Sequence, residues 1–185
     1  MRYLLNLVQY DGKKKFHSLK MIKDKVKATK LTVGLPFNLG QLEFEPDEVE
    51  QQAAWEIYVE LATRVTITPL SQGEGRVREA LESLYKIVQI TRDVLRKAGP
   101  SVAKGSNSVG SVAIEVVVKG IRPFLTKWHP LLLKYEQDKP DDLDSIDYER
   151  KWSESEYFYG DLGDLQEQMN IYLNALAIIA GVKTD

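Results

Sequence analysis

The sequence predicts a mainly α-helical protein, namely an antiparallel four-helix bundle with a small β segment at its amino-terminal end. Four stretches between residues 46 and 180 repeat apolar residues at helical spacing, and mostly short connections join them. Residues 1–45 instead alternate apolar and polar side chains and carry turn residues. We therefore expect residues 1–45 to form a β meander packed on a bundle of residues 46–185, in one compact domain.

The amino-terminal segment has the patterns of short strands. Residues 3–10 form an apolar run with a tyrosine near each end, residues 26–32 alternate imperfectly, and residues 41–45 alternate with a period of two. Glycine and proline residues between positions 34 and 40 predict turns. The basic run Lys13–Lys15 is expected to lie in a hairpin loop.

The first two predicted helices have clear start and stop signals. Proline and two acidic residues at positions 46–48 favour the beginning of a helix that we expect to span residues 46–66. A second apolar stripe begins at Val77 and continues to Leu95. The Gly99-Pro100 pair predicts the end of this second helix.

The third predicted helix is the most apolar one. Ser108 or Asn107 can cap its amino-terminal end, and its apolar residues cover a wide arc, so we expect it to be the most buried helix. Pro123 and Pro130 each remove a backbone donor. We therefore expect a kink at each proline.

The carboxyl-terminal part is acidic. Residues 136–147 contain a proline and many acidic residues and predict a linker, after which the last helix is expected to span residues 148–180 and to end at Gly181. Residues 136–185 have an acidic excess of nine charges and residues 1–45 a basic excess of five, although the net charge is only −2. These ends either attract each other, within or between subunits, or are two solvated surfaces.

The composition limits the classes of function. The chain has 185 residues, of which 43% are apolar and 28% charged, as in ordinary soluble globular proteins. It has no cysteine, which excludes disulfides, thiol nucleophiles and cysteine-ligated metals. The longest uncharged apolar run, residues 175–180, is too short to span a bilayer, and the amino-terminal run is too polar for a secretory signal. We therefore expect no membrane partner and a cytoplasmic location.

Motifs of familiar chemistry are absent. The sequence contains no phosphate-binding loop, no dinucleotide-binding glycine pattern, no paired-histidine metal motif and no nucleophile elbow. His17 and His129 are the only histidines, and the aspartates of residues 136–147 lack the spacing of a calcium-binding loop. Basic residues are not interleaved with aromatic residues as in a nucleic-acid-binding surface. We therefore expect neither a metal nor a cofactor.

Residues 120–130 contain the candidate catalytic pair. Arg122 and His129 are seven positions apart, close to two helical turns, so both can share one face of a helix. Histidine can act as a general base near neutral pH, and arginine can hold a phosphate through its fork of donors. These roles suffice for metal-independent cleavage of RNA. In the alternative interpretation, Arg122 forms a salt bridge and His129 caps carbonyls at a helix end.

This pair resembles the motif of HEPN-type ribonucleases, which are also all-helical and carry an arginine and a histidine near a helix end. The resemblance implies RNA as the substrate and Arg122 and His129 as catalytic residues. Pro123 departs from the family pattern, in which a polar residue is typical after the arginine. Roughly residues 50–180 also resemble a group of small bacterial helical proteins, some of which belong to defence or conflict systems. This second resemblance rests on residues 54–55, 63–64, 78–81, 91–93, 122–125 and 128–130.

Aromatic and acidic residues provide a candidate interaction surface. Three consecutive aromatic residues at positions 157–159 cannot all face one helical stripe, so at least one is expected to be exposed or to contact a partner, unless the helix is locally broken there. The predicted interaction residues are Tyr157, Phe158, Tyr159, Asp141, Asp142 and Asp144. The tryptophans are instead expected to be core anchors: Trp55, Trp128 and Trp152.

Three functions are compatible with these observations. The favoured one is a non-enzymatic helical module that binds a protein partner or itself, as a subunit or adaptor of a bacterial antiviral defence system. The first alternative is a HEPN-like ribonuclease that uses Arg122 and His129, and only this alternative has a nucleic acid as partner. The second alternative is a small-molecule sensor, because Gly105, Gly110 and Gly120 allow close approach to the backbone.

Overall fold

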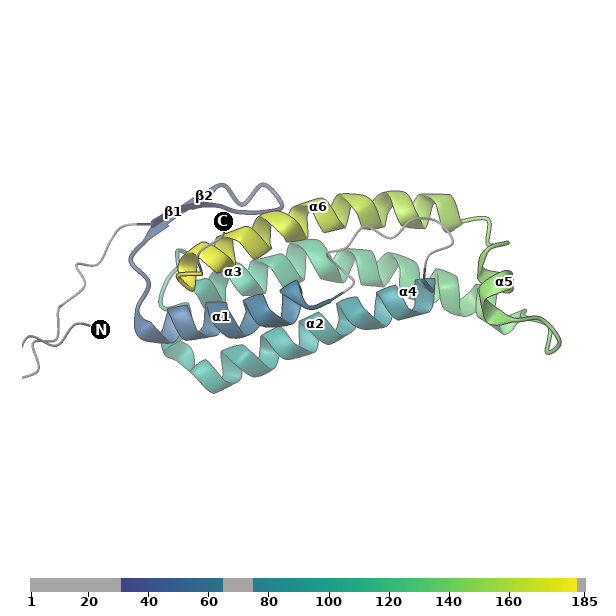
Figure 1. The fold of residues 1–185 in the computed structure, drawn as a ribbon, viewed down its shortest axis with the longest axis horizontal. Coiled ribbons are helices and arrows are strands. Elements are labelled where there is room, and N and C mark those ends of the chain that lie inside the picture. The colour runs from purple at the N-terminus through teal and green to yellow at the C-terminus, as the bar shows by residue number, and fades with distance from the viewer. Residues whose placement is uncertain (1–30, 65–74, 183–185) are drawn as a thin grey trace, which may run out of the picture.

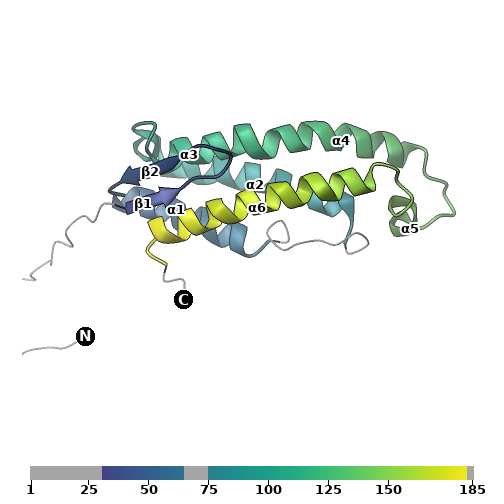
Figure 2. The same cartoon turned by 90° about the horizontal axis from the view of Figure 1, so that it is seen from above.

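The computed structural model describes residues 31–64 and 75–182, and within them the chain is mainly helical with a two-stranded antiparallel sheet. The α1 and α2 helices, the stretch from α3 to α4, and α6 lie side by side along the longest axis of the molecule (Figures 1 and 2). No helix among the described residues is long and apolar enough to cross a membrane. The elements are β1 (Leu31–Gly34), β2 (Gln41–Phe44), α1 (Glu48–Ala62), α2 (Val77–Ala98), the 3₁₀-helix η2 (Pro100–Ala103), α3 (Val109–Glu115), the π-helix η3 (Val116–Ile121), α4 (Arg122–Gln137), α5 (Ser145–Glu149) and α6 (Ser155–Ile179).

Local signals set three of the helix ends, and those at Ser108 and Gly99 are the predicted ones. The side chain of Asp47 accepts a hydrogen bond from the backbone of Glu50, whose carboxylate in turn accepts one from the backbone of Asp47, so α1 begins with a capping box. Ser108 caps α3. Gly99 ends α2 with a φ of 76°, a conformation that strongly favours glycine.

The carboxyl-terminal helix differs from the prediction. Residues 148–180 do not form one helix, because the chain forms the short α5, turns, and starts α6 only at Ser155. The turn between α5 and α6 places Trp152 in the core, where its ring lies 5.8 Å from that of Trp128 and 5.9 Å from that of Tyr135. Burial of this large aromatic side chain therefore favours a broken helix over a continuous one. The predicted linker is also shorter, since α4 continues to Gln137.

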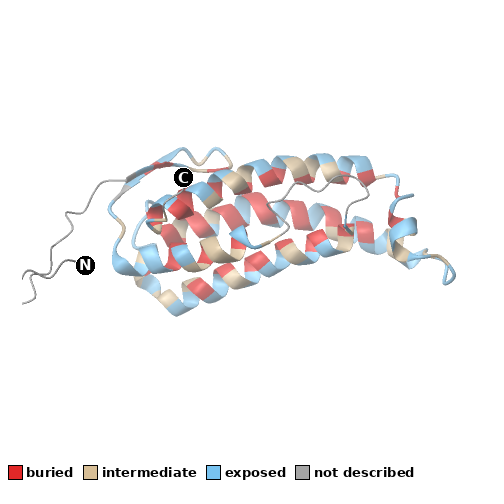
Figure 3. Cartoon of the chain, in the orientation of Figure 1, coloured by how far each residue is buried: buried red, intermediate tan, exposed pale blue. Residues whose placement is uncertain are grey.

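The sheet and the helices share one hydrophobic core. Val33 and Leu42 are paired across the strands, and each is only 2% exposed. Both belong to the same cluster of buried residues as the inward faces of the helices (Figure 3). Of the predicted β meander, the described residues contain only this hairpin, and the run at residues 3–10 lies outside them.

The tryptophan predictions are confirmed for two of three residues. Trp128 is fully buried and Trp152 is 5% exposed. The prediction for Trp55 is wrong, because its side chain is 45% exposed and stacks on Tyr58 at a centroid distance of 5.8 Å. The apolar stripe of α1 contains Ala54 and Ile57, which are buried, and Trp55 lies beside that stripe rather than on it.

A π-helix lies just before Pro123, where the sequence predicted a kink. The N–H of Arg122 donates to the carbonyl of Val117, five residues earlier, and the wider turn ends just before the proline, which has no N–H to donate. The chain also stays helical through Pro130, which lies inside α4. The π-helix contains one residue more per turn and therefore rotates α4 relative to α3.

Gly120 in the π-helix receives a side chain from the hairpin loop. A Cβ atom at this position would lie 2.2 Å from the ring of Phe37, and the N–H of Phe37 donates to Gln168 of α6 at 2.7 Å. Gly110 likewise lies against Val102, whereas Gly105 faces open space. At Gly110 and Gly120, atoms of the protein itself therefore make the close approach.

Candidate functional site: a groove between α2 and α4

Arg122 and His129 line the same open groove. Both belong to α4, and seven residues place them roughly 10 Å apart along the axis and about 20° apart around it. The groove has a volume of about 630 Å³, within the range of about 300–1,000 Å³ that is typical of ligand sites. The residues that line it are Tyr85, Val88 and Arg92 from α2 and Arg122, Leu125, Thr126 and His129 from α4.

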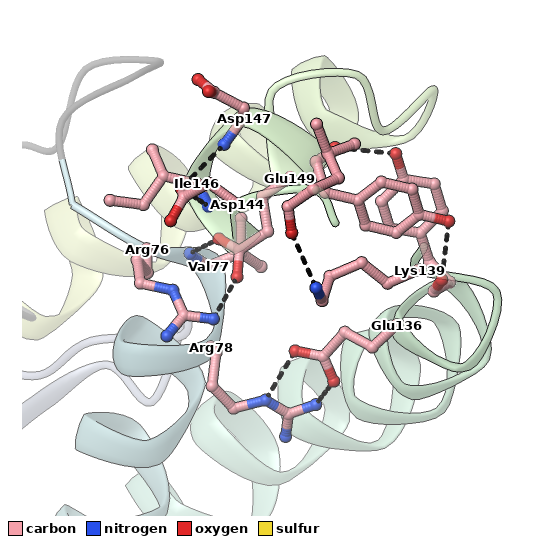
Figure 4. A network of polar contacts seen from close by, with 12 residues as sticks. Arg76, Val77, Arg78, Glu136, Lys139, Asp144, Ile146, Asp147 and Glu149 are labelled. Atoms are coloured by element: carbon pink, nitrogen blue, oxygen red, sulfur yellow. Dashed lines mark hydrogen bonds and ion pairs between the residues drawn. The ribbon is translucent and has the colours of Figure 1, made fainter. Parts of the chain in front are cut away.

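The two helices face each other in a register that repeats every seven residues. The guanidinium of Arg78 on α2 donates two hydrogen bonds to the carboxylate of Glu136 on α4, one of them 3.0 Å long (Figure 4). Because the helices run in opposite directions, one step of seven from this pair places Tyr85 opposite His129. A second step of seven places Arg92 opposite Arg122, and all four of these residues line the groove.

Two arginines in the groove have no acidic partner among the residues that the structure describes. Five of the seven arginines in residues 31–64 and 75–182 form an ion pair with an aspartate or glutamate. The two that do not are Arg92 and Arg122, which are both exposed. Since an unpaired guanidinium keeps all its donors for a ligand, this end of the groove is suited to bind a phosphate or a carboxylate.

His129 has the properties of a base that is neutral at physiological pH. Its side chain is half-buried. Burial lowers its pKa below the ordinary value, and the positive charge of Arg78 lowers it further, while Glu82 and Glu136 act in the opposite direction. The imidazole is therefore unprotonated near pH 7 and can accept a proton.

A polar network at the start of α2 includes Arg78 and Glu136, which lie seven residues before Tyr85 and seven residues after His129 (Figure 4). Beside the Arg78–Glu136 pair, the buried carboxylate of Glu149 accepts hydrogen bonds from Arg76 at 3.0 Å and from the backbone N–H of Val77 at 2.9 Å. Arg76 is the N-cap residue of α2 and provides no side-chain cap, so Glu149 of α5 satisfies this helix end instead. The network fixes the start of α2 and thereby the position of Arg78.

Sequence reasoning missed Tyr85 and Arg92. The sequence does contain a pattern that could have found them. One side of α2, beside its apolar stripe, carries Arg78, Tyr85 and Arg92 at intervals of seven residues. This pattern indicates a groove only when α4 is known to pack beside that side of α2. Among the described residues, no cluster of three or more histidine, cysteine, aspartate or glutamate side chains is placed to hold a metal ion.

The structure buries some of the predicted interaction residues and exposes others. Phe158 is fully buried, and its ring lies 5.4 Å from that of Trp128, so its assignment to an exposed surface is wrong. Tyr157 is 68% exposed, whereas Tyr159 is half-buried. Asp144 is exposed but caps α5 by accepting hydrogen bonds from two backbone N–H groups. The remaining exposed members are Tyr157, Asp141 and Asp142.

Comparisons of the chain with protein-family models, with curated proteins and with solved structures found no match. The function is therefore inferred from the groove itself.

Proposed function

We propose that this protein is a HEPN-like, metal-independent ribonuclease, built on an antiparallel four-helix bundle, that cleaves RNA in the groove between α2 and α4. The observation that supports this function is that Arg122 and His129 line one open groove, which also contains the unpaired Arg92. Two arginines provide phosphate binding and the neutral histidine provides a base, as RNA cleavage through the 2′-hydroxyl requires.

The proposed reaction is an internal transesterification. His129 accepts the proton of a ribose 2′-hydroxyl, and the 2′-oxygen forms a bond to the adjacent phosphorus. The bond from phosphorus to the 5′-oxygen breaks, and the departing oxygen takes a proton from water. The products are a 2′,3′-cyclic phosphate and a 5′-hydroxyl. Arg122 and Arg92 stabilise the negative charge that develops on the phosphoryl oxygens.

Purified protein should cleave a single-stranded RNA oligonucleotide in the presence of excess chelator, and the product should end in a cyclic phosphate. The matched control is the same oligonucleotide with 2′-deoxyribose throughout, which lacks the nucleophile and should stay intact. Gel analysis with mass spectrometry of the ends measures both results. Cleavage of the deoxy substrate, or cleavage that stops on chelation, would contradict the proposed chemistry.

A second candidate function is the non-enzymatic interaction module, as a cytoplasmic subunit or adaptor of a bacterial antiviral defence system. Tyr157 is 68% exposed near the start of α6, at the end of the molecule that also carries Asp141 and Asp142 (Figure 1). An exposed aromatic residue and two acidic residues at one end of the molecule are suited to a basic partner, for which a second copy of this chain offers the lysine-rich sequence of residues 1–30.

Replacing Asp141 and Asp142 together with lysine should weaken self-association at low salt, because the attraction to a basic surface becomes repulsion. Sedimentation of the wild type and the variant at low and high salt measures the effect. A wild-type protein that stays monomeric at every salt concentration would rule out a second copy as the partner.

A further inference from the structure

We infer that the substrate of the groove is single-stranded RNA and that Tyr85 is the surface on which one of its bases stacks. This inference rests on the proposed ribonuclease function and adds the substrate class and a specificity residue. Tyr85 lines the groove from α2 and is 48% exposed. Its ring stacks on no other aromatic ring among the described residues, and its exposed part is the surface that we propose a base covers.

The seven-residue register determines how a nucleotide fits. Tyr85 and His129 lie opposite each other, and Arg92 and Arg122 lie opposite each other roughly 10 Å further along the groove. A base on Tyr85 therefore places its ribose near His129, where the 2′-hydroxyl can lose its proton. The 3′-phosphate of the same nucleotide then extends toward the two arginines. The Arg78–Glu136 pair lies one step of seven residues beyond Tyr85 and His129 on the other side, so we expect the RNA strand to leave past Arg92 and Arg122 in its 3′ direction.

The geometry favours a single strand over a duplex. A base can stack on a side chain only when it has left its own helical stack, as in single-stranded loops and ends. Duplex RNA is instead held through phosphates and 2′-hydroxyls along an extended surface. This groove has two unpaired arginines at one end and no further arginine or lysine among the residues that line it, which is too short a track of positive charge for a duplex.

The test is a binding measurement in the His129→Ala background, which keeps the RNA intact. The probes are a fluorescein-labelled single-stranded RNA, the same strand in a duplex, and an abasic ribose-phosphate oligomer of equal length. Tyr85→Leu should weaken binding of the single-stranded RNA by about 5- to 100-fold, because a base–aromatic stack is lost. It should leave binding of the abasic oligomer unchanged, since the phosphates still meet Arg92 and Arg122. Tyr85→Phe should bind like the parent protein.

Trp55→Leu is the matched control, because it removes an exposed aromatic side chain outside the groove, and it should have no effect on RNA binding. If Arg122→Ala weakens RNA binding but Tyr85→Leu does not, the stacking inference is wrong and the proposed function stands. If the duplex binds as tightly as the single strand, the assigned substrate class is wrong. If neither RNA probe binds to the parent protein, both the inference and the proposed function are overturned.

Discussion

Replacing His129 with alanine should lower the rate of RNA cleavage by about 10²–10⁴-fold, the range that loss of a general base or acid usually costs. His129 is the one described residue of the groove whose side chain can take up a proton near neutral pH. RNA binding should change little, because the arginines that hold the phosphate remain. Single-turnover cleavage and equilibrium binding, measured on the same preparation, separate the two effects.

Lys134→Ala is the control for the loss of a basic residue from α4, since Lys134 is exposed and does not line the groove. Its cleavage rate should equal that of the wild type. A His129→Ala protein that is folded and still cleaves RNA at the wild-type rate would assign the base to another residue.

The pH dependence of kcat/KM provides an independent check on His129. The general base acts in its neutral form, so activity should be full above the pKa of His129 and should fall as the pH drops through it. Because burial and Arg78 lower this pKa, the fall should occur below about 6.5, the ordinary value for histidine. Arg78→Gln removes one of these causes and leaves Glu82 and Glu136, so the acid limb should move to higher pH. An unchanged acid limb would show that the titrating group is not His129.

Truncating Trp128 to alanine should lower the free energy of unfolding by about 3–5 kcal/mol, a large part of the stability of a typical domain. The indole is fully buried, its ring lies 5.4 Å from that of Phe158 and 5.8 Å from that of Trp152, and its N–H donates to Asp161 at 3.1 Å. The substitution leaves a cavity where α4, α6 and the turn between α5 and α6 meet, and it removes one of the two hydrogen bonds to the Asp161 carboxylate oxygen. Chemical denaturation measures the loss.

Trp55→Ala is the matched control, because it makes the same change at a residue that is 45% exposed. It should lower the free energy of unfolding by about 1 kcal/mol or less, chiefly because the partial burial of Trp55 and its stack on Tyr58 are lost. Lys127→Ala should also cost little, since the side chain is half-exposed and its ion pair with Asp161 is solvated. Equal losses for Trp128→Ala and Trp55→Ala would contradict the buried position of Trp128.

Features that depend on neighbouring residues in the chain were predictable. The capping box at Asp47, the serine cap of α3 and the glycine that ends α2 each satisfy backbone groups within one turn, so sequence alone specifies them. The same holds for the placement of Arg122 and His129 on one face, which follows from the helical period.

Features that depend on distant residues were not predictable. The last predicted helix is broken at Trp152 because the ring of Trp152 packs against that of Trp128. No local sequence pattern predicts this contact. The ring of Phe37 packs against Gly120 in the π-helix before Pro123. Phe37 belongs to a hairpin more than eighty residues earlier in the chain. Phe158 is buried in the core, whereas its neighbour Tyr157 is exposed. The spacing of the three aromatic residues did not determine which of them would be buried.

The sequence by itself thus determined a helical chain with defined ends and a candidate pair, Arg122 and His129, on one side of a helix. Only the tertiary structure decided that this side faces α2 and that Tyr85 and Arg92 complete the groove. The physical reason is that helical periodicity arises from hydrogen bonds within one segment, whereas the register between two helices is set by the packing of their buried side chains and by contacts such as Arg78–Glu136.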